Sequence, residues 1–403
     1  MEKYTVIVPV RDGSETIEHT LRTCLRQKYA NYEIIVSDNC STDSTRQVIE
    51  KFEDRRIRYI TPERRLSMAG NFDFALKHAD PGFVMFIGAD DGVMPGAIDY
   101  VAGIAEGLGV RAVSCRQATY IWPSFPDADI SGRLIFGGLR DDVEIRKSAE
   151  WLPRTLDFDC TYIFELPNLY CGFVHTEVIE KAIVSGRYFR SITPDAYSAF
   201  ATAVFLDSYA FSHRPFVVAG ASPKSNGASG MNPKSSGRVA EQFKAENDLE
   251  FHRNFVSCQS YEVIAAEAFA QLADAFPDAC SPYRINLRRL FETSVARANS
   301  RTEPAIREAV GRMIEIHAVP DVQAPTKKAS TRTMLNFATL IRVVRDLLIF
   351  RNRYTGVNHS DRYCIDNIDD AVIVAKVLSE LDGARDFETV SRMAVRAVLA
   401  RLN

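Results

Sequence analysis

The sequence predicts an α/β protein with a mostly parallel central sheet, helices on both faces, and a mainly α-helical C-terminal region. Two observations predict this fold. Short apolar runs alternate with amphipathic helical patterns over the first 120 residues, and the apolar spacing beyond residue 239 is almost entirely helical. A length of 403 residues with 25% charged residues excludes a mainly disordered chain.

The first strand is expected at Thr5–Val10, because the run TVIVPV is apolar and β-branched, as in a strand buried on both faces. Similar runs predict further strands at Glu33–Val36, Ile57–Ile60, Phe83–Ile87, Ala112–Cys115 and Phe216–Ala219.

Between these runs the apolar residues recur at helical spacing, as at Ile17, Leu21 and Cys24. Ser44 and Gln47 have the form of a capping box at the start of the next helix. Helices are also expected at 68–79, 176–183, 197–206, 239–256, 260–276, 286–299 and 304–316. Prolines and glycines predict an irregular insertion at 121–160.

Two stretches of loop-forming composition divide the chain. The segment Ser222–Gly237 is rich in Ser, Gly, Asn and Pro, and Val319–Thr331 carries two prolines and two lysines. We therefore expect a catalytic domain at 1–230, a helical region at 231–320, and a basic amphipathic and helical region at 321–403.

Composition limits the classes of partner. The formal net charge of −3 carries no global basic field that would attract nucleic acid. The eight cysteines include no C-x-x-C pair, and no stretch reaches the roughly 18 apolar residues of a membrane span. Because the chain enters an apolar strand without a signal-peptide pattern, a cytoplasmic protein is expected.

Acidic residues follow three of the predicted strands. Arg11-Asp12, Asp38-Asn39 and Asp90-Asp91 stand at the ends of the first, second and fourth strands. Ligands of parallel α/β sheets bind at these carboxyl ends, and carboxylates suit Mg²⁺ or Mn²⁺ carried in with substrate phosphates. An Asp-Asp-Gly sequence is also typical of a simple turn.

Familiar nucleotide and nucleophile motifs are absent from the sequence. There is no G-x-G-x-x-G after the first strand, no G-x-x-x-x-G-K-[ST] and no G-x-S-x-G. Without a glycine-rich cradle, the phosphates of a ligand need another partner, and a bound metal is the natural one.

Three sequence motifs of the chain resemble those of a known protein family. Thr5-Val-Ile-Val-Pro9, Glu33-Ile-Ile-Val-Ser-Asp38 and Phe86-Ile-Gly-Ala-Asp90-Asp91 resemble the motifs of family 2 glycosyltransferases. The resemblance runs from about residue 3 to residue 228. It implies a GT-A fold and an inverting enzyme that uses a nucleoside-diphosphate sugar, UDP-linked in the usual case, with a saccharide or lipid-linked acceptor in bacterial surface polysaccharide or glycan synthesis.

The resemblance implies roles for particular residues. Asp38 matches the acid that binds the nucleobase, and Asn71 resembles the asparagine that precedes the metal motif. Asp90 matches a ligand of the ribose or metal, and Asp91 a ligand of the metal, Mn²⁺ or Mg²⁺. The turn beneath the base is matched by Pro9, Val10, Arg11 and Asp12.

Asp195 matches the catalytic base of the family. It stands in Thr193-Pro194-Asp195 ahead of a helical pattern, and it would take the proton of the acceptor hydroxyl. The alternative is a helix cap, since Asp is a favoured N-cap residue.

The chain departs from the family pattern at several positions. Arg11 stands where an aromatic residue usually stacks on the base, Asp12 where Asn is common, and Gly88 where an acid is often found. A degenerate scaffold that binds nucleotide without turnover is therefore one alternative. A sugar nucleotidyltransferase is another, although Arg11-Asp12-Gly13-Ser14 is not its glycine-rich phosphate loop.

The C-terminal third lies outside the resemblance. Between residues 327 and 353, seven basic residues stand against one acid among interleaved apolar residues. This pattern is a candidate for peripheral contact with the inner face of the plasma membrane, and domain core is the alternative. Helical patterns beyond residue 360 are candidates for the same unit or for a homodimer contact.

Overall fold

The computed structural model describes residues 1–127, 130–135, 142–159, 162–225, 245–319, 356–357 and 365–380. Its main sheet has eight strands in the order β3-β2-β1-β4-β10-β6-β11-β9. They are β1 (Tyr4–Val10), β2 (Tyr32–Asp38), β3 (Ile57–Ile60), β4 (Phe83–Phe86), β6 (Ala112–Cys115), β9 (Val143–Lys147), β10 (Phe173–His175) and β11 (Ser208–Ser212).

All main-sheet strands run parallel except β9 and β10, which pair antiparallel with their neighbours. A second sheet has the order β13-β8-β7-β12-β5. Its strands are β5 (Gly92–Val93), β7 (Ala118–Ile121), β8 (Leu134–Ile135), β12 (Val217–Ala221) and β13 (Gly356–Val357).

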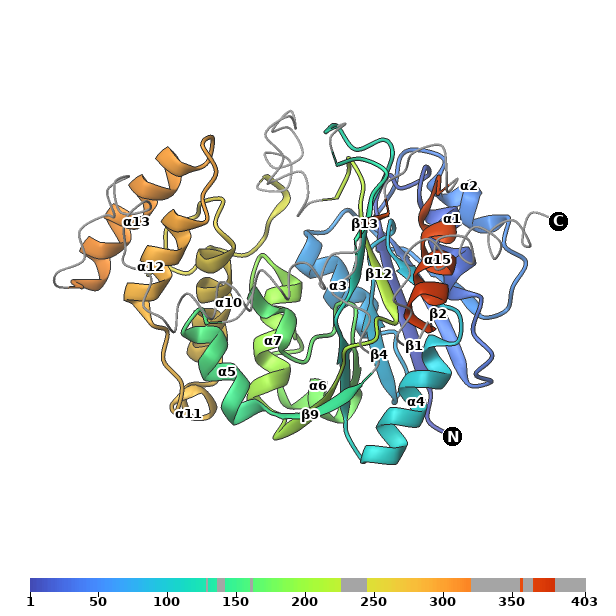
Figure 1. Cartoon of the computed structure of the whole chain (residues 1–403), viewed down its shortest axis with the longest axis horizontal. Coiled ribbons are helices and arrows are strands. Elements are labelled where there is room, and N and C mark those ends of the chain that lie inside the picture. The colour runs from blue at the N-terminus through green and yellow to red at the C-terminus, as the bar shows by residue number, and fades with distance from the viewer. Residues whose placement is uncertain are drawn as a thin grey trace.

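Helices cover both faces of the main sheet (Figure 1). On one side lie α1 (Ile17–Cys24), α2 (Thr45–Glu50), α4 (Ala97–Leu108) and α15 (Ile368–Glu380), and on the other α3 (Met68–Leu76), α5 (Ser148–Leu156), α6 (Thr176–Lys181) and α7 (Pro194–Val204). The predicted fold class, a mostly parallel α/β sheet covered on both faces, is confirmed.

Successive side chains of β1 point to opposite faces of the sheet and pack into two hydrophobic clusters. Val6, Val8 and Val10 pack into the cluster under α1 and α4, whereas Ile7 points into the cluster under α3 and α7. Both sets are buried, which is why the first strand reads as a continuous apolar run.

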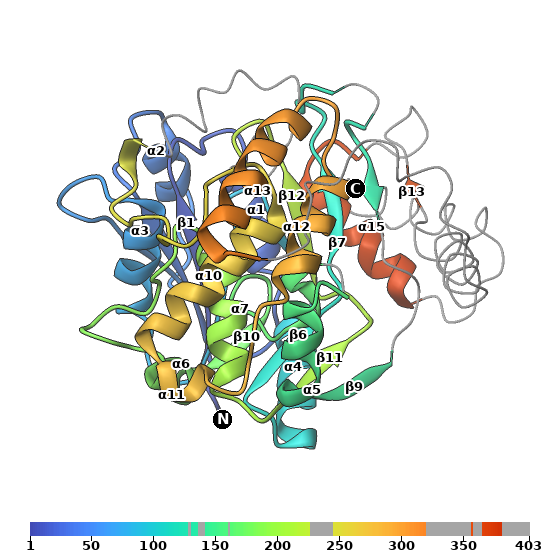
Figure 2. The same cartoon turned by 90° about the vertical axis from the view of Figure 1, so that its left-hand side faces the viewer.

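The helical region follows the sheet domain in sequence and packs on the α7 side of it. It contains α10 (Tyr261–Ala275), α11 (Pro277–Cys280), α12 (Leu287–Ala296) and α13 (Glu303–His317). Figure 2 shows α10, α12 and α13 in front of α7. The predicted helices at 260–276, 286–299 and 304–316 are confirmed.

Three local predictions are wrong. Residues 247–256 are not helical, because the acids near their start pair with distant arginines instead of facing solvent on a helix. The stretch 121–160 contains β8, β9 and α5 rather than only irregular chain. Ser44 lies at the N-cap of α2, but its side chain accepts no capping hydrogen bond, and Asp43 accepts from the Thr45 amide instead.

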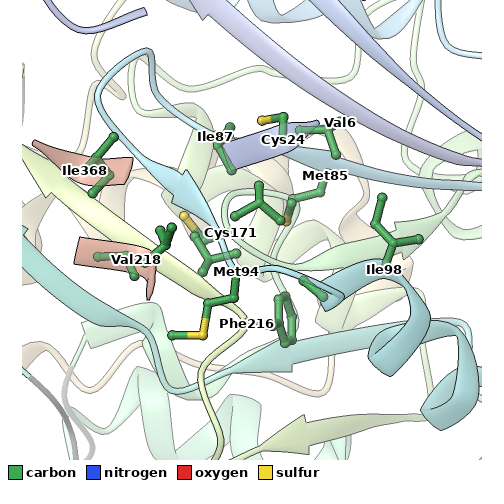
Figure 3. Close-up of a cluster of buried hydrophobic side chains, with 14 of the residues drawn as sticks. Val6, Cys24, Met85, Ile87, Met94, Ile98, Cys171, Phe216, Val218 and Ile368 are labelled. Carbon is green, nitrogen blue, oxygen red and sulfur yellow. The ribbon is translucent and has the colours of Figure 1, made fainter. Parts of the chain in front are cut away.

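Two later segments, residues 356–357 and 365–380, pack against the sheet domain. β13 pairs with β8, and α15 packs on α1. The Tyr120 hydroxyl donates to the Ile365 carbonyl (2.9 Å), and Arg26 forms an ion pair with Asp369, which is 1% exposed. Ile368 lies in the same buried cluster as Cys24, Met94 and Val218 (Figure 3). α15 therefore supports the sheet domain itself.

None of the described helices is long and apolar enough to cross a membrane. The basic segment 327–353 lies outside the described residues, so its membrane contact stays a prediction, as do the homodimer contact and the three domain limits.

Candidate active site

Three neighbouring strands bring the predicted site residues to one edge of the sheet. β1 pairs in parallel with both β2 and β4, and Val10 lies opposite Asp38 in the register. Asp90 and Asp91 follow β4 at the same edge. The carboxyl ends of parallel strands therefore gather these acids, as the sequence predicts.

The turn after β1 is tied to the loop after β2. Asp12 has a positive φ of 51°, a conformation that Asp tolerates better than most residues. Its Oδ1 accepts from the Thr42 amide (2.7 Å), while its own amide donates to Ser41 Oγ (2.8 Å). A carboxylate thus fits position 12, because the three groups that reach Oδ1 there, the Thr42 amide and hydroxyl and the Asp43 amide, are all donors.

Asp38 is buried at the end of β2, with 2% of its surface exposed. Its Oδ1 accepts from the Ser41 amide (2.9 Å) and its Oδ2 from the Tyr59 hydroxyl (2.8 Å). Burial, followed by the hydrogen bond to Asp38, raises the pKa of Tyr59 to about 12, so the phenol remains a donor at neutral pH. Each Asp38 oxygen keeps a further lone pair for a nucleobase N–H.

Asn71 occupies a supporting position. It is 3% exposed on α3, and its Oδ1 accepts from the Ser37 hydroxyl (2.9 Å) beside Asp38. Asn71 therefore joins α3 to β2 behind the candidate base-binding acid.

Asp91 is fully buried and held by two amide donors and one hydroxyl donor, with the Cys171 thiol 3.9 Å from its Oδ2. Its Oδ2 accepts from the Gly88 amide and the Tyr170 hydroxyl, and its Oδ1 from the Gly220 amide, each at 2.6 Å. Burial, followed by the charge of Asp90, raises the pKa of Asp91 to about 7. The carboxylate is anchored by the protein on both oxygens.

Asp90 is the more accessible of the pair. It is only partly buried, and its Oδ2 accepts from the Ser222 amide (3.1 Å) and from the Ser225 hydroxyl, both just after β12. The resemblance implies metal roles for both residues. In the structure Asp90 is the partly exposed member of the pair and Asp91 the fully buried one, and their roles stay a prediction.

Crowding explains why an acid is absent at position 88. A Cβ on Gly88 would lie 2.9 Å from Asp90 Oδ1 and from the Tyr170 hydroxyl, and 3.1 Å from Asp91 Oδ2. Tyr170 thus fills the space beside Asp91, and its hydroxyl supplies a donor that a third carboxylate would not.

Tyr170→Phe is expected to destabilise the protein more at high pH than at low pH. The folded-state pKa of Asp91 is raised to about 7, so its favourable contribution is complete below about pH 4 and is lost as pH rises through 7. The Tyr170 hydrogen bond lowers that pKa, so its removal extends the loss to higher pH. Urea unfolding should show a cost of about 1–3 kcal/mol at pH 8 and a smaller cost at pH 5.

The matched control is Tyr29→Phe, since the Tyr29 hydroxyl donates to the Glu2 carbonyl, which does not titrate. An equal cost of Tyr170→Phe at both pH values would contradict the assignment of its effect to Asp91.

Asp195 lies in the first turn of α7. Thr193 is the N-cap and Pro194 the first helical residue, so the alternative of Asp195 as the N-cap is wrong by position. The carboxylate is partly buried, and burial raises its pKa. A negative charge in this turn is also favoured by the helix dipole.

Asp195 lies in the same neighbourhood as Asp90 and Asp91. The charges of all three carboxylates raise the pKa of the Cys171 thiol, although burial is the larger cause. Cys171 Sγ lies 3.9 Å from Asp91 Oδ2. Ser198 of α7 donates to Asn168 Oδ1 (2.6 Å), which also accepts from the Tyr170 amide (2.8 Å), so the first turns of α7 are tied to the segment beside Asp91.

The helical region fixes the turn that carries Asp195. Glu267 of α10 is fully buried and accepts from Ser191 Oγ (2.7 Å), which in turn accepts from the Thr193 amide (3.2 Å). Burial raises the pKa of Glu267. Tyr261, at the start of the same helix, is 39% exposed, and burial, followed by the charge of Asp195, raises its pKa to about 12.

Several site residues were not predicted from the sequence. Tyr170, Gly220, Ser225, Glu246 and Glu267 come from distant positions, and only the Ser- and Gly-rich composition of 222–237 indicated a loop there. Lys224 Nζ also donates to the Asp12 carbonyl (2.6 Å), joining the residues after β12 to the turn after β1.

A second group of ligand-type side chains lies elsewhere on the main sheet. Carboxylate and imidazole atoms of Asp142, Glu144 and His213 lie within 4.8 Å of one another on β9 and just after β11. Three strands, β10, β6 and β11, separate β9 from β4. This group is therefore distinct from the Asp90–Asp91 pair.

The fold and the gathered carboxylates define an α/β protein with a ligand site at the carboxyl edge of its parallel strands. Residues 5–156 match the family model described as glycosyl transferase family 2. This part of the chain is thus similar to family 2 glycosyltransferases, in agreement with the resemblance.

Two curated relatives match the same kind of segment. The UDP-Glc:α-D-GlcNAc-diphosphoundecaprenol β-1,3-glucosyltransferase WfgD of Escherichia coli is 37% identical over 87 residues, which are 22% of this chain and 34% of the relative. The putative teichuronic acid biosynthesis glycosyltransferase TuaG of Bacillus subtilis is 34% identical over 89 residues, 22% of this chain and 35% of the relative. The chain thus spans about a third of the length of the curated relatives it matches.

Among solved structures, that of Staphylococcus aureus TarS in complex with UDP-GlcNAc has a TM-score of 0.47 at 17% identity. The match covers 78% of this chain and 81% of the TarS chain.

Proposed function

We propose that this protein is an inverting glycosyltransferase that moves a sugar from a UDP-linked donor to a saccharide or lipid-linked acceptor. The observation that carries the proposal is the gathering of Asp38, Asp90 and Asp91 at the carboxyl edge of three neighbouring parallel strands. The glucosyltransferase WfgD, named for a UDP-Glc donor and a diphosphoundecaprenol-linked acceptor, supports both substrate classes and a role in bacterial surface glycan synthesis. We place the reaction in the cytoplasm.

Each residue has a part in a single in-line displacement. Asp195 takes the proton of the acceptor hydroxyl as its oxygen forms a bond to the anomeric carbon. The bond between that carbon and the diphosphate oxygen breaks on the opposite face, and the electron pair leaves with the nucleoside diphosphate. The anomeric centre is therefore inverted.

The carboxylates of the Asp90–Asp91 corner fit a hard divalent cation, Mn²⁺ or Mg²⁺, because their oxygens are the ligands such ions prefer. Asp90 would hold the cation on its open side, and Asp91, fixed by Gly88, Tyr170 and Gly220, adds negative charge behind it. When bound, the cation would offset the charge that builds up on the departing diphosphate.

The nucleotide end is assigned to the turn after β1 and to Asp38. Pro9 and Val10 end the strand, Arg11 and Asp12 form the turn, and Asp38 lies opposite Val10. Asn71 acts through Ser37 rather than on the ligand.

A thermal-shift screen of UDP, GDP, CDP, dTDP and their sugars with Mn²⁺ or Mg²⁺ tests the proposal. UDP or a UDP-sugar with Mn²⁺ should raise the melting temperature, because a ligand that binds only the folded state stabilises it. Asp90→Asn should remove the part of the shift that depends on Mn²⁺. The matched control, Asp99→Asn on an exposed position of α4, should leave it unchanged.

The same experiment separates the alternatives. Nucleotide binding without any transfer or donor hydrolysis would favour a non-catalytic scaffold. Preference for a nucleoside triphosphate together with a sugar phosphate would favour a nucleotidyltransferase.

A further inference from the structure

A short segment beyond the family-matched part of the chain lies against the nucleotide end of the site. We call residues 246–248 the strap. Its Glu246 forms ion pairs with Arg11 and with Arg65 Nη1 (3.3 Å). Figure 2 shows the yellow chain around residue 245 beside α3.

The other end of the strap is anchored separately. Asp248 accepts from Ser67, which is the N-cap of α3, and forms an ion pair with Arg187 (3.1 Å). The strap therefore reaches from α3 to the turn after β1 and holds Glu246 in place against Arg11.

The charges around Arg11 compensate one another. Arg65 also lies 3.5 Å from Asp12 Oδ2, so two guanidinium groups alternate with the carboxylates of Glu246 and Asp12. Both Arg11 and Glu246 keep part of their side chains exposed, at 27% and 22%. A neutral flat ligand that covers Arg11 would thus meet a planar surface with little net charge.

A guanidinium is planar and delocalised, and it stacks on flat rings. On a long flexible side chain it gains from being held in one orientation, because the entropy of ordering it is then lost on folding and not on binding. Glu246 supplies that restraint through its bond to Nη1 of Arg11.

We propose that Glu246 is a positioning residue of the nucleotide site, which fixes the Arg11 guanidinium as the stacking surface for the nucleobase. The inference rests on the proposed function and deepens it. The base-binding surface is then shared between the turn after β1 and a strap from outside the matched segment, 235 residues further along the chain.

Isothermal titration calorimetry of the full chain with UDP, GDP, CDP and dTDP in the presence of Mn²⁺ tests the inference. Glu246→Gln should weaken binding of the preferred nucleotide by about 3- to 10-fold and reduce the preference among the four bases. Binding of inorganic pyrophosphate, which has no base, should not change. A carboxylate that merely competed with phosphates for Arg11 would have the opposite sign, so tighter binding in Glu246→Gln would overturn the inference, as would unchanged binding.

A double-mutant cycle separates positioning from general stability. In an Arg11→Phe background, where a ring stacks without help from Glu246, Glu246→Gln should have no further effect on nucleotide affinity. Glu303→Gln is the matched control: it removes a Glu–Arg ion pair of similar exposure, with Arg307 in α13, and should leave base preference intact. An equal loss in Glu246→Gln with and without Arg11→Phe would overturn the inference.

Different results would contradict the proposed function and the role of Glu246. If the wild-type protein binds none of the four nucleotides, the proposed function and the inference both fall. If it binds one of them and Glu246→Gln behaves as the wild type, the inference alone falls.

Discussion

Asp195→Asn is expected to lower sugar transfer by about 10²- to 10⁴-fold while making the folded protein more stable at neutral pH. The loss follows because the amide cannot take the proton of the acceptor hydroxyl. The gain follows because burial raises the pKa of Asp195, so its charged form is a cost to the folded state that Asn removes. Initial rates with the donor found in the nucleotide screen and urea unfolding measure the two effects.

The direction of the pKa shift of Asp195 determines how its effect on stability depends on pH. A raised folded-state pKa means that the contribution of Asp195 to stability is complete below about pH 4 and is lost as pH rises through the folded value. Asp195→Asn should therefore stabilise at pH 7 and change little near pH 4. Transfer by the wild type should fall on acidification as the base becomes protonated, and its acid limb should lie above the usual range of an aspartate.

Asp207, exposed beyond the end of α7, provides the matched control. Asp207→Asn should change neither transfer nor the pH dependence of stability. If Asp195→Asn transferred sugar at the wild-type rate, Asp195 would not be the base.

Sequence patterns predicted the elements whose burial is marked within their own segment. β1 is apolar on both faces, and α1 repeats its apolar residues at helical spacing, so each could be recognised within its own segment. β9 could not be, because Glu144 and Arg146 lie inside it. Charged side chains are expected to face solvent. Arg146, however, is only 4% exposed, and its Nη1 donates a hydrogen bond to Glu165 Oε2 (2.7 Å).

The same distinction holds at the site. Asp38, Asp90 and Asp91 were predicted because strand ends in a parallel sheet share an edge. Tyr170 and Glu246 were missed, since their partners lie 79 and 235 residues away in sequence and nothing local marks the pairing. The difference in burial between Asp90 and Asp91 was also outside the reach of the sequence, because it depends on which carboxylate those distant donors cover.

α15 packs closely against Gly92, the residue that follows Asp91. Gly92 begins β5, and a Cβ at this position would lie 2.5 Å from Val372 Cγ1 and 2.9 Å from Ile368 Cγ1 of α15. Both α15 residues are fully buried. The close packing of α15 on β5 therefore requires glycine next to the carboxylate pair.

Gly92→Ala is expected to destabilise the protein by about 1–3 kcal/mol, because the added methyl group overpacks a buried contact. Movement of β5 would also shift Asp91 and Asp90, so transfer should fall by roughly 10- to 100-fold. Chemical unfolding and initial rates measure the two effects. Val372→Ala removes the Cγ1 atom that the methyl group meets, so in the double variant part of the loss should be recovered.

Gly103→Ala provides the opposite control. Gly103 lies inside α4, and a Cβ added there would meet no atom within 4 Å, so alanine should stabilise the protein by about 0.5–1 kcal/mol through its better helix propensity. If Gly92→Ala destabilised the protein no more than Gly103→Ala, the packing of α15 would not constrain Asp90 and Asp91. A loss in Gly92→Ala that Val372→Ala relieves would instead tie the C-terminal helix, far from the matched segment in sequence, to the geometry of Asp90 and Asp91.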